Sequence, residues 1–312
     1  MNYNKLNAGR RHLAMRSEKE MFDVILGVAQ KDERIRAVYM NGSRTNPKAP
    51  RDIFQDYDIV YVVTETASFI QDDKWKDVFG KLLMIQEPDK NDLGDGLTMD
   101  FARSYGYLML FTDGNRIDLQ IETKAAMMDR YVSDTLTIPL LDKDNCLPFI
   151  PAPSDIDYHV KKPSELLFMS CCNEFWWCLQ NVAKGIWRDE LPYAKLMYEN
   201  TTRASLDKMV SWWIGTMYDF QVSTGTMGKY FKNLLPESHW EMYKGTYSDA
   251  NYANVWESIF IACDLFRILA KHITEFFKYT YPEDDDSAMT VYLKQVRELS
   301  VHAKEETPLA LP

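Results

Sequence analysis

The first 141 residues alternate between apolar patterns with helical and with strand periods. Between residues 18 and 30 apolar side chains recur at steps of three and four, which predicts an amphipathic helix. Ser17 and Glu20, just before this stretch, have the spacing of a capping box. The helix is therefore expected to begin at about Glu18 and to end near Gln30.

Short apolar runs with strand character follow this helix. Strands are predicted at residues 36–40, 58–64, 82–85, 105–111 and 116–121. A helical stretch is expected at residues 68–79, and polar loops at residues 45–55 and 87–100. Residues 112–115, Thr-Asp-Gly-Asn, join the last two strands and carry a hairpin signal. This half of the chain is therefore predicted to be an α/β domain with a mixed sheet.

The pattern changes where four prolines lie within sixteen residues, at positions 148, 151, 153 and 163. Beyond them only helical periodicity is found. Helices are predicted at residues 164–184, with Gly185 as the stop, and at 192–218, 252–277 and 289–299. The acidic run at residues 283–286 is interpreted as a solvated linker. The sequence thus predicts an α/β domain at residues 15–150 and an all-helical C-terminal domain at residues 151–312.

The net charge of the chain indicates which kinds of molecule it is suited to bind. The chain has 312 residues, of which 46% are hydrophobic, and its formal net charge is −10. Such an acidic protein is not suited to binding a phosphate backbone, which disfavours a nucleic-acid partner. The negative charge would attract a cationic small molecule, but it is also explained by the contribution of charge to solubility alone.

The cysteines and the N-terminal residues indicate in which cellular compartment the protein is expected. Five cysteines without framework or zinc spacing argue against a secreted disulfide scaffold, and Cys171, Cys172 and Cys178 are expected to be buried thiols. No apolar run reaches transmembrane length, so no membrane association is predicted. Residues 1–14 are polar and basic, and are interpreted as a leader or an added extension, with Met15 as a possible natural start. A cytoplasmic protein is expected.

The strongest chemical signal combines a turn with two carboxylates. Asn41-Gly42-Ser43 follows a predicted strand, and Asp56 and Asp58 open the next one. Gly42 allows a close backbone approach, and Ser43 offers a hydroxyl and an N–H to a phosphate. Two carboxylates two residues apart on a strand share one face, and oxygen donors of this kind suit Mg²⁺.

A third carboxylate fits the same pattern. In the strand at residues 116–121 apolar residues alternate with Arg116, Asp118 and Gln120, so that Asp118 projects from the polar face. If this strand neighbours the one that Asp58 opens, three carboxylates converge. Such a set can hold two Mg²⁺ ions that act on the attacking and leaving oxygens of a displacement at phosphorus.

Gly-Ser, then Asp-x-Asp, then a later strand Asp is the signature of the polymerase-beta-like nucleotidyltransferase superfamily, which this chain resembles. From about Met15 to Leu293 the amino-acid sequence also resembles the aminoglycoside 6-adenylyltransferases, the streptomycin-modifying branch of this superfamily. The segments that carry this resemblance are RAVYMNGSRTNP, DIFQDYDIVYVV, FTDGNRIDL, HVKKP, CCNEFWW, VAKGIWRDE and YAK.

The resemblance implies an activity and a set of site residues. It implies transfer of AMP from ATP to the 6-hydroxyl of the streptidine ring, with release of pyrophosphate and, in a bacterium, antibiotic resistance. Asp56, Asp58 and Asp118 match the family's metal-binding acids. Gly42, Ser43 and Arg44 match its triphosphate-binding turn.

The helix at residues 164–184 supplies candidates for binding the acceptor. Its polar residues form one stripe, which includes Glu174 and Trp177 and which in a generic helix would simply face water. Carboxylates bind guanidinium groups and aromatic rings stack on them, so a streptomycin-like ligand suits this stripe. Trp187, Asp189 and Glu190 extend the set, although Asp189 equally suits a helix N-cap before Pro192.

Two lysines are candidates for neutralising ATP phosphates. Lys184 ends the polar stripe, and Lys195 is favoured by resemblance to related antibiotic nucleotidyltransferases. The active site is expected in the cleft between the two domains. The proton of the acceptor hydroxyl would go to Asp118 or to a glutamate of the helical domain.

Other functions remain as alternatives. The acceptor could be a different aminoglycoside or a lincosamide, and a catalytically silent nucleotide-binding regulator is the alternative from another class. The intact carboxylate set argues against the regulator. A polymerase is disfavoured by the acidity and by the lack of a basic, aromatic-interleaved stretch. The sequence does not fix the oligomeric state, for which a monomer is the simpler expectation.

Overall fold

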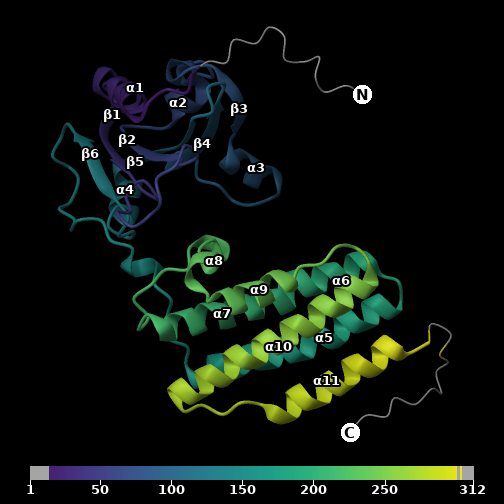
Figure 1. Cartoon of the computed structure of the whole chain (residues 1–312). Coiled ribbons are helices and arrows are strands. Elements are labelled where there is room, and N and C mark those ends of the chain that lie inside the picture. The colour runs from purple at the N-terminus through teal and green to yellow at the C-terminus, as the bar shows by residue number, and fades with distance from the viewer. Residues whose placement is uncertain (1–13, 301–302, 304–312) are drawn as a thin grey trace. The chain divides into compact units, whose positions relative to one another are not determined.

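The computed structural model describes residues 14–300 and residue 303, so the predicted leader at residues 1–14 lies, apart from its last residue, outside the described part. The chain divides into two compact units, Met1–Asp157 and Tyr158–Pro312. Figure 1 shows the strands in the first unit and the long helices in the second. The predicted fold class, a mixed-sheet α/β domain followed by a helical domain, is confirmed.

A six-stranded sheet forms the first unit, in the order β3-β4-β5-β2-β1-β6. Neighbours are antiparallel except β2 and β5, which run parallel. The strands are β1 (Ile35–Met40), β2 (Tyr57–Val63), β3 (Leu82–Gln86), β4 (Ser104–Phe111), β5 (Arg116–Thr123) and β6 (Ile138–Asp142). Five of them were predicted. The edge strand β6 was missed because IPLLD is short, contains a proline and lacks alternation.

The register between β2 and β5 places two carboxylates on adjacent strands. Asp58 is the partner of Asp118 in the parallel pair, which confirms the expected neighbourhood. Both strands are rich in apolar and β-branched residues, which favours extended backbone. On β5 the buried Ile117, Leu119 and Ile121 face the opposite side of the sheet from Asp118.

Helices cover both faces of the sheet. On one face, α1 (Glu18–Lys31) packs Met21, Ile25 and Ala29 into the main core. Its capping box is present as predicted, with Ser17 accepting from the Glu20 N–H. On the other face, α4 (Lys124–Arg130) packs against a smaller cluster around Val60 and Val62. This smaller cluster supports one end of the face that carries Asp58 and Asp118.

Two predictions of local structure in this unit were wrong in detail. The single helix expected at residues 68–79 is divided into α2 (Ala67–Gln71) and the 3₁₀ helix η2 (Trp75–Phe79). The division occurs because Asp72 adopts an extended conformation that ends α2. The predicted loop at residues 87–100 contains α3 (Pro88–Gly94), which begins with the proline at its first position, where a helix tolerates it.

In the second unit the regular structure of the described residues, 158–300 and 303, is helical. The helices are α5 (Glu165–Trp187), α6 (Leu191–Met197), the π-helical η4 (Tyr198–Thr202), α7 (Arg203–Met217), the 3₁₀ turn η5 (Thr226–Gly228), α8 (Phe231–Leu234), α9 (Glu237–Gly245), α10 (Tyr252–Phe277) and α11 (Glu283–Glu298). A 3₁₀ turn, η3 (Ile156–Tyr158), joins the units. The predicted helix at residues 252–277 matches α10. The one expected at residues 192–218 is interrupted by η4, and α8 and α9 were missed.

Gly185 does not stop α5, which continues to Trp187. The glycine is buried, and a Cβ atom there would lie 2.9 Å from Tyr193 and 3.1 Å from Ala194 of α6. Its role is therefore to let α6 pack closely on α5. The three cysteines of α5 are buried free thiols, as predicted.

The acidic run at residues 283–286 is not a linker, so that interpretation was wrong. It forms the first turn of α11, where negative charge is favourable at a helix N-terminus. Asp286 is buried and accepts hydrogen bonds from Arg267 and from the Tyr281 hydroxyl, at 2.6 and 2.8 Å. Sequence spacing could not show these partners because Arg267 comes from α10.

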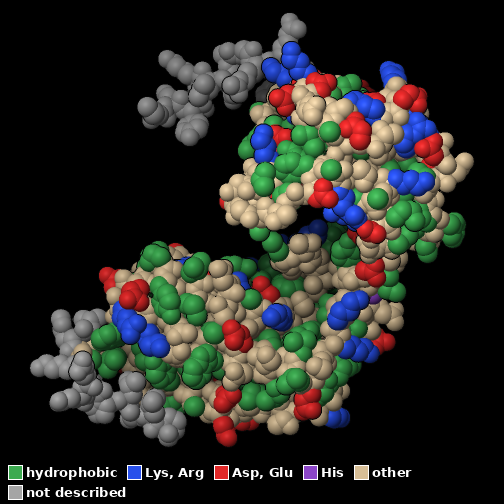
Figure 2. Space-filling view, turned by 180° about the vertical axis from the view of Figure 1, so that it is seen from behind, with side chains coloured by type: hydrophobic (Ala, Val, Ile, Leu, Met, Phe, Trp, Pro, Cys, Tyr) green, Lys and Arg blue, Asp and Glu red, His purple; other side chains and the backbone are tan. Residues whose placement is uncertain are grey.

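Surface charge is mixed. In the space-filling view of Figure 2, Lys and Arg side chains are interspersed with Asp and Glu, and no extended basic surface is visible on that face. Within residues 14–300, no helix combines the length and hydrophobicity needed to cross a membrane.

Candidate active site

The turn after β1 brings the backbone of Gly42 against Asp58. Gly42 has φ +76°, which favours glycine, and a Cβ atom there would lie 2.1 Å from Asp58 Oδ2. The turn is closed by hydrogen bonds from the N–H and the hydroxyl of Thr45 to the carbonyl of Gly42. The N–H of Asn41 donates to the carbonyl of Asp58 at 2.9 Å, which joins the turn to β2. Gly42 is therefore needed for the close approach of this turn to Asp58, while the predicted approach to a phosphate stays a prediction.

Arg44 lies in the same turn, but its side chain is used to hold the segment before β2. Its guanidinium donates to the carbonyls of Asp56 and Gln55 at 3.0 and 2.9 Å. It also lies over the ring of Tyr57, 3.7 Å from the centroid. With these contacts and only 9% of its side chain exposed, Arg44 positions the backbone of Asp56. The structure thus gives the side chain a structural role beside the predicted one at the triphosphate.

Three carboxylates influence one another at the start of β2 and β5. Burial, followed by the negative charges of Asp118 and Asp56, raises the pKa of Asp58 to about 6. Burial also raises the pKa of Asp56, against the opposing effect of Arg116. Asp58 lies opposite Asp118 in the parallel strand pair and two residues after Asp56, so the negative charges of these groups repel one another. The condition set from the sequence, that the two strands are neighbours, is met.

Arg116 supplies a positive charge to this group. Its Nε and Nη2 donate to the two carboxylate oxygens of Asp118, both at 2.7 Å. Its Nη1 lies 3.4 Å from Asp56 Oδ2. The guanidinium therefore bridges two of the three predicted metal ligands.

The donor set fits a hard divalent cation. Carboxylate oxygens are the ligands that Mg²⁺ prefers, and burial together with repulsion by Asp118 and Asp56 raises the pKa of Asp58. Among residues 14–300 and 303, however, no three His, Cys, Asp or Glu side chains are already arranged as a metal cluster. Asp56, Asp58 and Asp118 could hold Mg²⁺ once their side chains turn towards one another.

A pocket of about 350 Å³ opens beside the carboxylates within the first unit. Asp58 and Asp118 line it together with Gly42 and Gln120. Asn41 also lines it, and its Oδ1 accepts a hydrogen bond from the hydroxyl of the buried Thr137 at 2.9 Å. The pocket therefore has a polar wall next to the turn that the sequence predicts to bind the triphosphate.

Asn41, Gln120 and Asp134 line this pocket but were not among the predicted site residues. Gln120 could have been found, because it alternates with Arg116 and Asp118 on the polar face of β5. Asp134 could not, since it lies in the connection between α4 and β6 and only the fold brings it to the pocket.

The candidate acceptor-binding residues of the helical unit do not all line one pocket. Trp177 and Lys184 line a groove of about 670 Å³ between α5 and α11, together with Met289 and Tyr292. Trp177 is 63% exposed, so its ring is available for stacking. Glu174 is exposed on the same helix but is not part of the lining.

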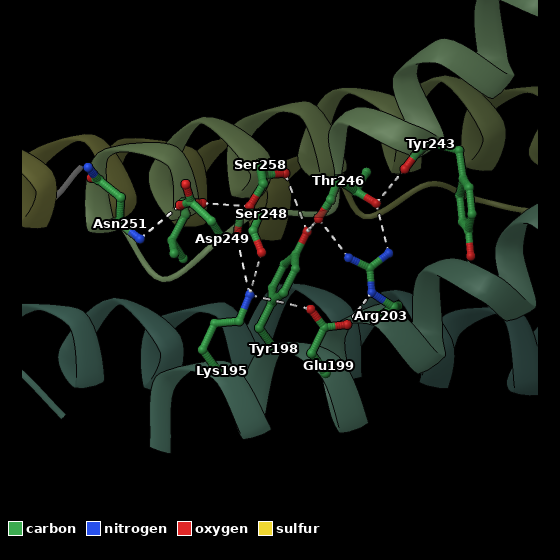
Figure 3. A network of polar contacts seen from close by, with 11 residues as sticks. Lys195, Tyr198, Glu199, Arg203, Tyr243, Thr246, Ser248, Asp249, Asn251 and Ser258 are labelled. Atoms are coloured by element: carbon green, nitrogen blue, oxygen red, sulfur yellow. Dashed lines mark hydrogen bonds and ion pairs between the residues drawn. The ribbon is translucent and has the colours of Figure 1, made fainter. Parts of the chain in front are cut away.

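Lys195 belongs to a different part of the helical unit, the polar network of Figure 3. Its Nζ donates to the carbonyl and hydroxyl oxygens of Ser248, at 3.1 and 3.2 Å, and lies 3.7 Å from Glu199. Glu199 also pairs with the buried Arg203, which donates to the carbonyl of Thr246. In this conformation Lys195 holds the segment before α10, and it would have to leave Ser248 to reach a phosphate.

The remaining candidates lie near the end of α5. Asp189 accepts from the Tyr252 hydroxyl at 2.9 Å. It does not cap α6, so that structural alternative was wrong: the residue before α6 is Glu190, which makes no side-chain cap. Trp187 donates from Nε1 to the carbonyl of Ser300 at 3.2 Å. Asp189 and Glu190 are exposed and Trp187 is partly buried.

The glycine turn, paired strand carboxylates and mixed sheet define a nucleotidyltransferase site. Comparisons with known proteins agree with this class. A profile described as streptomycin adenylyltransferase matches residues 15–296. The chain is 39% identical to an aminoglycoside 6-adenylyltransferase of Campylobacter jejuni, with 92% of this chain and 98% of the relative covered. It is 38% identical to one of Bacillus subtilis, with 90% and 98% covered.

The chain therefore belongs to the streptomycin adenylyltransferase family and is an adenylyltransferase. A relative named aminoglycoside 6-adenylyltransferase in Staphylococcus aureus is 33% identical, with 86% of this chain and 94% of the relative covered. A crystal structure titled as an aminoglycoside 6-adenyltransferase from Bacillus subtilis shares 34% identity, covers 91% of this chain and 99% of that chain, and superposes with a TM-score of 0.45.

Proposed function

We propose that this chain transfers AMP from ATP to the 6-hydroxyl of streptomycin, releases pyrophosphate and thereby confers resistance to the antibiotic. The single observation that carries this proposal is the contact of Gly42 with Asp58, in register with Asp118 on the adjacent strand. It joins a phosphate-binding turn to metal-binding carboxylates in one pocket. The family profile and the names of the relatives support the choice of acceptor.

The chain's own residues bind and orient the nucleotide. We expect the backbone N–H and the hydroxyl of Ser43 to donate to phosphate oxygens. Asp56, Asp58 and Asp118 would hold Mg²⁺, two ions in our proposal, and the bound metal would supply positive charge to offset that of the triphosphate and of the pyrophosphate leaving group. Positioning and charge neutralisation then contribute most of the rate enhancement.

The proton of the acceptor hydroxyl goes to Asp118 or to a glutamate of the helical unit. Asp118→Asn separates the two roles of this residue. If Asp118 only accepts the proton, the chemical step slows and affinity for MgATP stays nearly unchanged. If it also binds metal, as we expect, the Mg²⁺ dependence of the rate shifts as well. A wild-type rate with wild-type Mg²⁺ dependence would rule out both roles.

The helical unit supplies the contacts to the cationic acceptor. Carboxylates of Glu174, Asp189 and Glu190 pair with guanidinium groups, while Trp177 and Trp187 stack on them. Lys184 and Lys195 neutralise phosphate charge, Lys195 after leaving Ser248.

The direct test is mass spectrometry of streptomycin after incubation with the full chain, ATP and Mg²⁺. We expect the mass of the antibiotic to increase by one AMP group, with release of pyrophosphate. Other aminoglycosides and a lincosamide are incubated in parallel, because an adduct on one of these alone would transfer the proposal to that acceptor. No adduct on any of them, with no pyrophosphate released, would contradict the proposal.

A second experiment tests the acceptor-binding residues. Glu174→Gln removes a charge but keeps the shape, so streptomycin binding weakens by about tenfold while ATP binding is unchanged, as expected for loss of a charged hydrogen bond. Both affinities are measured by calorimetry. Glu165→Gln, at an exposed position in the first turn of the same helix, is the matched control. Equal losses for both ligands, or none, would contradict the role of Glu174.

A further inference from the structure

The guanidinium group of Arg116 lies next to two of the carboxylates that are proposed to bind metal. Arg116 binds both oxygens of Asp118 at 2.7 Å and approaches Asp56 at 3.4 Å. A bidentate guanidinium–carboxylate pair is among the strongest hydrogen-bonded pairs in proteins. The carboxylate oxygens of Asp118 thus already have partners at the positions where a cation would be coordinated.

The three carboxylates repel one another, so a nearby positive charge stabilises them. Three carboxylates lie at the start of adjacent parallel strands, and Asp118 and Asp56 both act on Asp58 through their negative charges. The positive charges of Arg116 and Arg44 oppose this repulsion at Asp58. One or both of them therefore keep the carboxylates together when no metal is bound.

Arg44 cannot serve as a mobile counter-charge. Its guanidinium is fixed by two backbone carbonyls, by Glu18 and by the ring of Tyr57, and its side chain is 9% exposed. The Arg116 side chain, by contrast, is 41% exposed, and it makes its polar contacts with Asp118 and Asp56. Arg116 can therefore turn into solvent without disturbing the core.

We propose that Arg116 is a built-in counter-cation: it holds Asp118 and Asp56 in the metal-free enzyme and must release both before a divalent cation can bind between them. The inference rests on the proposed metal-binding role of the three carboxylates. It explains why these side chains do not already form a metal cluster, since two of them are turned towards the guanidinium. Arg116 is thus a positioning residue that competes with the metal.

The competition predicts the direction in which metal affinity changes. A residue that merely supported the metal site would lower the affinity for metal when removed. A competing cation raises it when removed, because the free carboxylates no longer have to break an ion pair. Charge-assisted hydrogen bonds commonly change an equilibrium constant by about tenfold or more, so we expect removal of the Arg116 pair to increase the affinity for metal by about tenfold.

The experiment measures Mn²⁺ binding to the full-length, nucleotide-free protein by electron paramagnetic resonance of the free ion. Arg116→Gln is expected to bind Mn²⁺ about tenfold more tightly than the wild type. Arg116→Lys keeps the charge but cannot form the bidentate pair, so its affinity should lie between the two. Arg103→Gln is the control, because Arg103 is equally exposed and pairs with Asp129 away from the pocket. Its Mn²⁺ affinity should equal that of the wild type.

A second readout comes from the same proteins. Saturating Mn²⁺ should raise the melting temperature of Arg116→Gln by more than it raises that of the wild type, because ligand stabilisation follows affinity. Unchanged or weaker Mn²⁺ binding in Arg116→Gln, with measurable binding in the wild type, would overturn the counter-cation and leave the proposed metal site standing. No Mn²⁺ binding in either protein would overturn both.

Discussion

The Cα atom of Gly42 lies against the carboxylate of Asp58, so closely that a Cβ atom on Gly42 would be 2.1 Å from Asp58 Oδ2. The two residues come from a turn and from the following strand, sixteen positions apart. Their contact sets the distance between the backbone proposed to bind phosphate and an oxygen proposed to bind metal. Any side chain at position 42 would therefore alter both halves of the site.

Gly42→Ala should abolish most of the AMP transfer. The methyl group displaces the Asp58 carboxylate, and the left-handed backbone of residue 42 adds a cost of about 1 kcal/mol. The transfer rate and the Mn²⁺ affinity are measured together, and both should fall. Gly27→Ala is the control: a Cβ atom there meets nothing within 4 Å, and alanine in α1 should stabilise the protein by about 1 kcal/mol. Normal transfer by Gly42→Ala would show that the contact is not needed.

Asp56→Asn and Asp58→Asn should each abolish transfer while the fold stays intact. Each variant removes an anionic metal ligand but keeps the shape of the side chain. AMP transfer is followed by mass spectrometry, and circular dichroism reports on folding. Asp52→Asn changes an exposed aspartate of the same segment and should retain full activity. Near-normal turnover in either ligand variant would refute the metal assignment.

The raised pKa of Asp58 predicts how stability depends on pH in the metal-free protein. The pKa is 3.8 in a typical exposed aspartate and about 6 in the folded chain, chiefly because of burial. Ionised Asp58 therefore costs about 3 kcal/mol of folding free energy above pH 6, at 1.4 kcal/mol per pKa unit. The cost fades as the pH falls from 6 towards 4, because the folded protein takes up the proton first.

Asp58→Asn should therefore melt at a higher temperature than the wild type at pH 8 in the presence of EDTA. The difference should shrink towards zero at pH 4. Saturating Mg²⁺ should reduce or reverse it at pH 8, because the wild type gains the metal and the variant does not. Equal melting temperatures at pH 8 in EDTA would show that Asp58 ionises without cost.

Asp286→Ala should destabilise the helical unit by about 3 kcal/mol. The substitution leaves Arg267 without its main partner, and losing one member of a buried ion pair has a cost of this size. Denaturant unfolding measures the change. Asp284→Ala, at an exposed position in the same helical turn, should cost about 0.5 kcal/mol, from the helix dipole alone. Similar small losses in both variants would restore the interpretation of this run as a solvated segment.

The sequence by itself determined those features that depend on local periodicity and on the spacing of special residues. The capping box at Ser17, the alternation in β5 and the helix at residues 252–277 all appear where they were predicted. The class of site was also predictable, because a strand, a glycine turn and Asp-x-Asp form a rare combination within a short stretch. The neighbourhood of Asp58 and Asp118 was a conditional prediction, since strand pairing is a long-range property that periodicity does not encode.

Only the tertiary structure decided which partners the polar side chains find. From the sequence, Asp286 was interpreted as solvated, but in the structure it pairs with Arg267 of α10. Lys195 was interpreted as available to bind phosphate, but in the structure it donates hydrogen bonds to Ser248. Gly185 looked like a helix stop because glycine often ends helices, but close packing by α6 determines its place within α5. In each case a residue from another helix or loop accepts or donates a hydrogen bond or packs against the glycine. That pairing follows from burial and packing of the whole unit, which local patterns do not contain.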